Sequence, residues 1–121
     1  MANFGMIGGG LVVSETIDKS NEIIITDVAS GTYTRVQCYK TGRQCHFSCY
    51  IASESSARNI QIEFPSDMHP TVNVDFLGWM YYNNDTQIAR ASIVPSSNKT
   101  DIINVPANYT FATNLDWISE Y

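Results

Sequence analysis

Hydrophobic and polar residues alternate along most of this chain, in short runs separated by polar turn residues. Alternation with a period of two predicts β-strands that bury one face. No window of helical period extends over three turns, so almost no helix is expected. The expected strands are residues 22–28, 33–40, 43–52, 59–64, 72–82, 86–94, 100–105 and 115–121. Eight short strands at this spacing predict an all-β fold, an antiparallel sandwich of the jelly-roll type.

The clearest local prediction is a hairpin around Thr41 and Gly42. With these two residues as the loop, Lys40 faces Arg43 and Cys38 faces Cys45. Alternation then separates a core face from a wet face. The core face holds Thr34, Val36, Cys38, Cys45, Phe47, Cys49 and Ile51, and the wet face holds Arg35, Gln37, Gln44, His46 and Ser48, with tyrosines interleaved.

The three cysteines of this hairpin invite a zinc or disulfide interpretation. Cys45 and Cys49 stand four residues apart on one strand, roughly 13–14 Å, whereas two thiolates of one zinc ion each lie about 2.3 Å from the metal. His46 points away from both. A disulfide between Cys38 and Cys45 would be strained, because directly opposed hydrogen-bonded residues have Cα atoms about 5.5 Å apart, although another turn type would reopen this question. We expect three reduced thiols and neither a metal nor a cofactor.

One run interrupts the alternation within residues 72–82. Apolar residues occupy every second position up to Phe76, and then Leu77, Gly78 and Trp79 follow without a polar residue between them. A glycine at such an interruption predicts a β-bulge or bend at Gly78.

Length and charge limit the partners of this chain. A chain of 121 residues is enough for one domain, expected over residues 22–121 and preceded by an extended N-terminal arm of residues 1–21. The net charge is −5, and the seven basic residues form no run, so nucleic acid is not an expected partner. No apolar run is long enough to cross a bilayer, so membrane insertion is not expected either.

Candidate chemistry is sparse, and no enzyme is predicted. Neither His46 nor His69 has a neighbouring nucleophile in a known local pattern. The combination that looks most like a recognition surface is aromatic, with amides and a carboxylate beside it: Trp79, Tyr81, Tyr82, Asn83, Asn84 and Asp85. Flat rings beside hydrogen-bonding groups suit a glycan. Alternation directs half of these rings inward, so core packing and a subunit contact are the alternative.

From Thr32 onward the order of elements resembles the C-terminal head domains of bacteriophage tail-fibre, head-fibre and receptor-binding proteins. The resemblance rests on the hairpin turn Lys40-Thr41-Gly42, on the segment Phe64-Pro65-Ser66-Asp67-Met68-His69-Pro70 after a short strand, and on the strand-like end Trp117 to Tyr121. The segment follows the family pattern L-P-x-G-[FY]-R-P in the spacing of its two prolines and departs from it at Phe64, Asp67, Met68 and His69.

This resemblance implies a homotrimer of head domains at the tip of a virion appendage. Such a protein is made in the host cytoplasm, contacts other virion proteins and binds a polysaccharide of the host surface without catalysis. Two alternatives to this interpretation remain. One is a structural capsid-decoration or virion-assembly protein without a ligand, and the other is the carbohydrate-binding module of a secreted enzyme.

Overall fold

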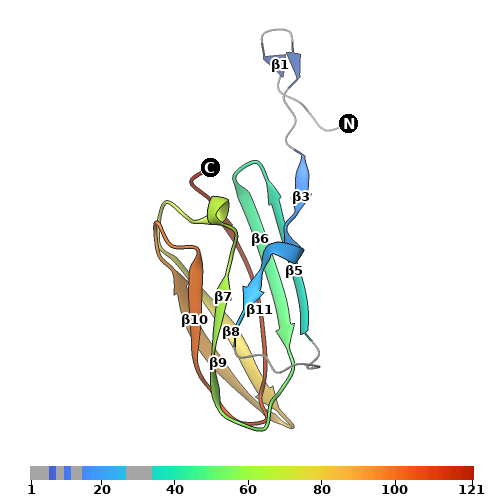
Figure 1. The fold of residues 1–121 in the computed structure, drawn as a ribbon, viewed down its shortest axis with the longest axis vertical. Helices are drawn as coiled ribbons and strands as arrows, with labels where there is room; N and C mark the ends of the chain where they lie inside the picture. The colour runs from blue at the N-terminus through green and yellow to red at the C-terminus, as the bar shows by residue number, and fades with distance from the viewer. Residues whose placement is uncertain (1–5, 8–9, 12–14, 27–33) are drawn as a thin grey trace.

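The computed structural model describes residues 6–7, 10–11, 15–26 and 34–121 (Figure 1). Two short 3-10 turns, η1 (Ser20–Glu22) and η2 (Ser66–Met68), accompany the strands. The strands are β1 (Met6–Ile7), β2 (Gly10–Leu11), β3 (Thr16–Asp18), β4 (Ile24–Ile25), β5 (Thr34–Thr41), β6 (Gln44–Ile51), β7 (Arg58–Glu63), β8 (Val74–Tyr82), β9 (Asp85–Ile93), β10 (Lys99–Val105) and β11 (Thr110–Ile118).

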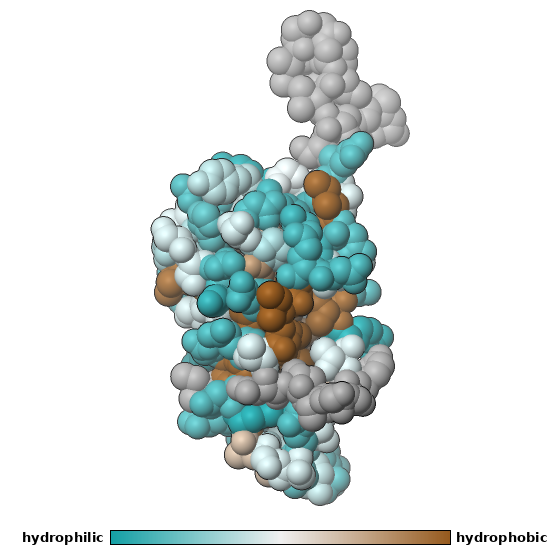
Figure 2. Space-filling view, viewed as in Figure 1, coloured by the Kyte–Doolittle hydropathy of each residue, from teal (hydrophilic) through white to brown (hydrophobic). Residues whose placement is uncertain are grey.

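Two antiparallel sheets pack face to face. The larger has six strands in the order β3-β5-β6-β11-β8-β9, and the smaller has three in the order β10-β7-β4. Figure 1 shows the smaller sheet in front of the larger one. Figure 2, from the same side, shows a largely hydrophilic surface with an apolar patch over β4, where Ile24 is exposed. The expected all-β antiparallel sandwich is confirmed.

The strand boundaries differ from expectation at both ends of the chain. The last strand begins at Thr110 and not at residue 115, because the buried polar side chain of Thr113 hides the alternation. In the described part of the expected strand 22–28, which is residues 22–26, the strand is Ile24–Ile25. Residues 27 and 28 lie outside the described residues, which resume at Thr34. Within the predicted arm, β3 pairs with β5. The division into an arm (residues 1–21) and a head domain (residues 22–121) stays a prediction.

The β5–β6 hairpin forms with a register two residues away from the expected one. Its loop is Gly42-Arg43, since Thr41 pairs with Gln44, and Gly42 has a φ of 58°, which glycine adopts without strain. The predicted pairs Lys40–Arg43 and Cys38–Cys45 are therefore wrong. Cys38 faces Phe47, and Lys40 faces Cys45. A shift by two residues leaves the faces unchanged, so the predicted core face is buried or half-buried.

All three cysteines are free and buried. Burial raises the pKa of the Cys38 and Cys49 thiols to about 12. Burial also raises the pKa of Cys45 above its usual value. These thiols are core side chains, in the protonated form that neither binds a metal nor attacks a disulfide.

The bulge predicted at Gly78 is wrong. Pairing between β8 and β9 continues without a shift from Val74–Ile93 to Tyr82–Asp85. Phe76, Gly78 and Met80 face the core, while Leu77 and Trp79 face outward and are exposed. The alternation was hidden because apolar residues occupy both faces of this strand.

The proline segment and the C-terminal strand close one end of the sandwich together. Phe64 packs edge-on against the rings of Phe47 and Trp117. The indole Nε1–H of Trp117 donates to the Met68 carbonyl oxygen over 2.7 Å, and Pro70 bridges to Ser119. The segment that carries the family resemblance is thus a corner that covers the core.

Candidate functional site

The larger sheet has one face turned away from the smaller sheet, which we call the outer face. Alternation assigns its side chains, and nearly all of them are half-buried or exposed. They include Arg35, Gln37 and Tyr39 from β5, Tyr50, Ser48 and His46 from β6, Ala112, Asn114 and Asp116 from β11, Leu77, Trp79 and Tyr81 from β8, and Thr86, Ile88 and Arg90 from β9. Among the described residues, shallow hollows open at three places on this face.

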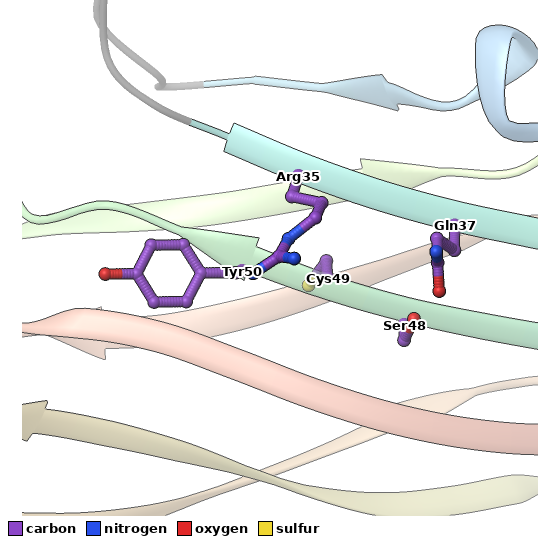
Figure 3. A pocket seen from close by; sticks show the side chains of 5 residues that line it. All are labelled: Arg35, Gln37, Ser48, Cys49 and Tyr50. Atoms are coloured by element: carbon purple, nitrogen blue, oxygen red, sulfur yellow. The ribbon is translucent and has the colours of Figure 1, made fainter.

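The first hollow, which we call the Arg35 hollow, lies on the β5–β6 hairpin and measures about 200 Å³. Arg35 is directly opposite Tyr50, and Gln37 is directly opposite Ser48. Figure 3 shows the guanidinium of Arg35 reaching from β5 toward β6. The side chains that line this hollow offer hydrogen-bond donors from a guanidinium, an amide and hydroxyl groups.

The second hollow, the His46 hollow, measures about 480 Å³ and lies further along the same hairpin. Tyr39, His46 and Asp116 stand side by side on three adjacent strands. The rings of Tyr39 and His46 are nearly parallel, with centroids 6.3 Å apart. Nδ1 of His46 lies 2.7 Å from Oδ1 of Asp116. In the neutral imidazole this bond places the proton on Nδ1 and leaves Nε2 as an acceptor.

A histidine bonded to an aspartate is also found in hydrolase triads, whose third member is a nucleophile bonded to the histidine. Within the described residues no serine, threonine or cysteine hydroxyl or thiol bonds to Nε2 of His46. The neighbouring thiol, Cys45, belongs to the buried face of β6. The pair can orient an imidazole toward a hydroxyl-bearing ligand, and among the described residues no nucleophile is bonded to it.

The third hollow, of about 510 Å³, lies at the opposite edge of the outer face. It is lined by Leu77 and Arg90 together with Asp75 and Ser92. Oδ1 of Asp75 accepts hydrogen bonds from the Ser92 hydroxyl and from the Asn73 amide. This carboxylate is therefore already occupied.

The six residues predicted to bind a glycan do not converge on one hollow. Trp79 and Tyr81 lie on the outer face, whereas Tyr82 and Asp85 have the opposite orientation in the pleat. Asn83 and Asn84 form the turn between the two strands. Trp79, Tyr81, Tyr82, Asn83, Asn84 and Asp85 therefore form two groups, and their role as glycan ligands stays a prediction.

The second of these groups is organised around the carboxylate of Asp85. Tyr109 donates its hydroxyl proton to Oδ2 of Asp85, and the Gln87 amide donates to the same oxygen over 3.0 Å. These bonds lower the pKa of Asp85 and raise the pKa of Tyr109. The ring of Tyr82 lies 5.8 Å from that of Tyr109. The hydrogen bonds hold the tip of the β8–β9 hairpin against the start of β11.

Trp79 belongs instead to a strip of exposed hydrophobic residues, the apolar stripe of Leu77, Trp79 and Ile88. Their exposed fractions are 42%, 44% and 57%. Trp79 is directly opposite Ile88 on one side and Ala112 on the other. Contiguous exposed apolar side chains are typical of surfaces that contact another protein.

The two arginines of the outer face differ from the other basic residues in their bonding partners. Among the described residues, five of the seven lysines and arginines bond to a carboxylate or a carbonyl: Lys19, Lys40, Arg43, Arg58 and Lys99. Arg35 and Arg90 make no such bond. Both of these free guanidinium groups lie on the outer face, and each lines a hollow.

In the part of the chain that the structure describes, no three His, Cys, Asp or Glu side chains gather as metal ligands. No helix within those residues has the length and apolar character needed to cross a membrane.

Comparison with solved structures identifies the fold. No protein-family model matches the chain, and no curated protein matches it in sequence. Its structure is similar to the crystal structure of the head domain of phage bIL170, from work on the receptor-binding domains of lactococcal phages, with a TM-score of 0.50. The match covers 80% of this chain and 98% of that chain at 15% identity. This chain has the fold of a phage receptor-binding head domain.

The fold resemblance inferred from the proline segment is thereby confirmed, and at this identity it extends to the fold alone. Sequence reasoning placed Arg35, Gln37, His46 and Ser48 on a wet face but did not consider them as a site. The signal was available, since these outward positions of one hairpin are all polar. The hydrogen bond between Asp116 and His46 could not be predicted, because the pairing of β11 with β6 was not predicted.

Proposed function

We propose that this chain is a virion fibre or receptor-binding head domain that adsorbs a bacteriophage to polysaccharide on the host cell. The observation that carries the proposal is the fold shared with the head domain of phage bIL170 over most of both chains. The hairpin and the proline segment, which resemble those of such domains, support the proposal from the sequence itself.

The proposed role is binding without catalysis. The His46–Asp116 pair has no nucleophile bonded to it among the described residues. Both ring nitrogens of the other histidine, His69, are occupied by Ser66 and Glu120. The outer face therefore offers groups that can hold a ligand, and no described constellation that would turn it over.

A homotrimer is part of the proposal, and the apolar stripe supports it. Burying Leu77, Trp79 and Ile88 against another copy would remove apolar area from water at about 25 cal/mol per Å². Three copies on one fibre would convert weak saccharide contacts into firm adsorption. The chain would then act on the virion surface, beside other virion proteins, after synthesis in the host cytoplasm. Its charge of −5 argues against nucleic acid as a partner.

Two measurements test the proposal. Light scattering on the purified protein gives the mass in solution, and sedimentation with host cell walls gives binding to surface polysaccharide. A trimer that sediments with the walls is the expected result. A trimer that binds no wall polysaccharide would overturn receptor binding in favour of a capsid-decoration or assembly protein. A monomer that binds would favour a carbohydrate-binding module of a secreted enzyme.

A further inference from the structure

The Arg35 hollow and the His46 hollow are consecutive positions along one hairpin. The pairs Arg35–Tyr50, Gln37–Ser48 and Tyr39–His46 follow one another on the outer face. Tyr39 follows Arg35 by four positions, which corresponds to roughly 14 Å at about 3.4 Å per residue. An extended ligand lying along the strands would contact both hollows at once. We call the two hollows together the β5–β6 groove.

The Arg35 end of the groove is suited to an anion. The guanidinium of Arg35 forms no ion pair within the described residues, although the chain carries 12 acidic residues against 7 basic ones. Gln37 and Ser48 line the same hollow with an amide and a hydroxyl group, at the next outward pair of the hairpin (Figure 3). A guanidinium fork in a hollow that also holds neutral donors matches the several oxygens of a phosphate or carboxylate.

The His46 end of the groove is suited to a neutral ring with hydroxyl groups. Tyr39 and His46 present two nearly parallel rings, and Asp116 holds the imidazole through Nδ1. In the neutral imidazole Nε2 can accept a hydrogen bond from a hydroxyl group of the ligand. Asp116 accepts the hydrogen bond of the imidazole. Its carboxylate lies at the opposite end of the groove from Arg35, so it is far from the anion of the ligand.

We propose that the β5–β6 groove is a binding site for an acidic oligosaccharide, with its phosphate or carboxylate at Arg35 and an uncharged sugar ring at Tyr39 and His46. The proposal deepens the proposed function and rests on it, since it names the site and the ligand feature through which a head domain would recognise a surface saccharide. It places the ligand away from the apolar stripe, which remains available for contacts between copies.

The test is a titration of the isotope-labelled full chain followed by nuclear magnetic resonance. The probes are glycerol 3-phosphate and galacturonate as anions, with glycerol and galactose as their neutral counterparts. Both anions are expected to shift the amide signals of residues 35, 37, 48 and 50 saturably, and the neutral probes are expected to shift them far less. The two anionic probes also distinguish phosphate from carboxylate as the preferred group.

Two matched variants locate the charge. Arg35→Gln is expected to weaken binding of the anionic probes about tenfold, a factor that corresponds to roughly 1.4 kcal/mol. Arg90→Gln removes the other free guanidinium of the same face and is expected to leave the affinity within about twofold. Raising the salt concentration should weaken binding to the parent protein and affect Arg35→Gln less.

Several results would overturn the groove assignment. These are anion-induced shifts that centre on residues outside the groove, equal responses to charged and neutral probes, the absence of any saturable shift, or unchanged affinity in Arg35→Gln. None of them would contradict the proposed function, because binding to host walls is measured separately. Conversely, wall binding that fails while the anions still bind at Arg35 would contradict the proposed function alone.

Discussion

Gly78 of β8 lies directly beneath the ring of Phe111 of β11. A β-carbon at position 78 would lie 2.5 Å from Cε1 and 2.7 Å from Cζ of that ring, and 3.2 Å from the carbonyl oxygen of Ala112. Phe111 is fully buried and cannot move toward solvent. The absence of a side chain at Gly78 therefore allows the two strands to pair around a large aromatic residue.

This contact predicts the outcome of Gly78→Ala. The added methyl group must displace the Phe111 ring or the strand, and overpacking of this kind costs about 1–3 kcal/mol. Urea unfolding followed by tryptophan fluorescence measures the loss. The cost should shrink in a Phe111→Leu background, which vacates the space of the ring edge. Equal losses in both backgrounds would show that the ring is not the obstacle.

The glycine also shows what the sequence could and could not reveal. The middle strands and the two faces of the hairpin followed from alternation, because a residue's face depends on its parity and not on its exact partner. The register of the β5–β6 hairpin did not follow, because Thr41-Gly42 and Gly42-Arg43 both make acceptable two-residue loops. At Gly78 the pattern failed because Leu77 and Trp79 are exposed, and burial cannot be inferred from hydrophobicity alone.

The candidate site followed from the sequence only in part. The wet face of the hairpin was predicted, but its extension to Asp116 depends on pairing between β6 and β11, residues about 70 positions apart. Neither periodicity nor a local motif reports such a pairing. The cluster from Trp79 to Asp85 was contiguous in sequence, and the pleat of the strand and the turn after it divide it in space.

The buried thiols should be unreactive in the folded protein. With the pKa of Cys38 and Cys49 near 12, almost none of either thiol is the reactive thiolate at neutral pH. Ellman's reagent should therefore titrate none of the three cysteines rapidly in native buffer and all three after denaturation. Rapid reaction of one thiol in native buffer would show that its part of the core opens readily.

The apolar stripe predicts a residue-specific effect on self-association. Ile88→Asp places a charge opposite Trp79, and burying that charge between copies would be costly, so the mass in solution should fall to that of the monomer. Thr86→Asp adds the same charge two residues away on the same face of β9 and serves as the control. Thermal unfolding of the Ile88→Asp monomer should remain cooperative, because Ile88 is exposed. An unchanged mass in Ile88→Asp would exclude the stripe as the contact between copies.

The same stripe separates the two interpretations of Trp79. Trp79→Ala should leave the fold intact, since the indole is outside the core. If Trp79 binds a glycan, the variant should lose wall binding with its mass unchanged. If Trp79 forms part of the contact between copies, as we propose, the mass of the variant in solution should fall. Tyr82→Ala, on the opposite side of the pleat, should leave the mass unchanged and provides the comparison within the same strand.

His69 joins the proline segment to the C-terminal residues through hydrogen bonds of its imidazole ring. Nδ1 of His69 lies 2.8 Å from the Ser66 carbonyl oxygen, and its Nε2 lies 2.6 Å from Oε2 of Glu120. Both partners are acceptors, so the doubly protonated imidazolium satisfies both bonds. The hydrogen bond that His69 donates to Glu120, followed by the one that it donates to the Ser66 carbonyl, raises the pKa of His69 above its usual value of 6.5.

The raised pKa of His69 determines how stability depends on pH. Because the folded protein holds this proton more tightly than the unfolded chain, the stabilisation is fully present below about pH 6.5 and is lost as the pH rises through the higher pKa of the folded state. Melting temperatures measured across this range should fall with rising pH in the parent protein. Glu120→Gln removes the main cause of the shift and should flatten this part of the profile. A parallel decline in Glu120→Gln would assign the pH dependence to a group other than His69.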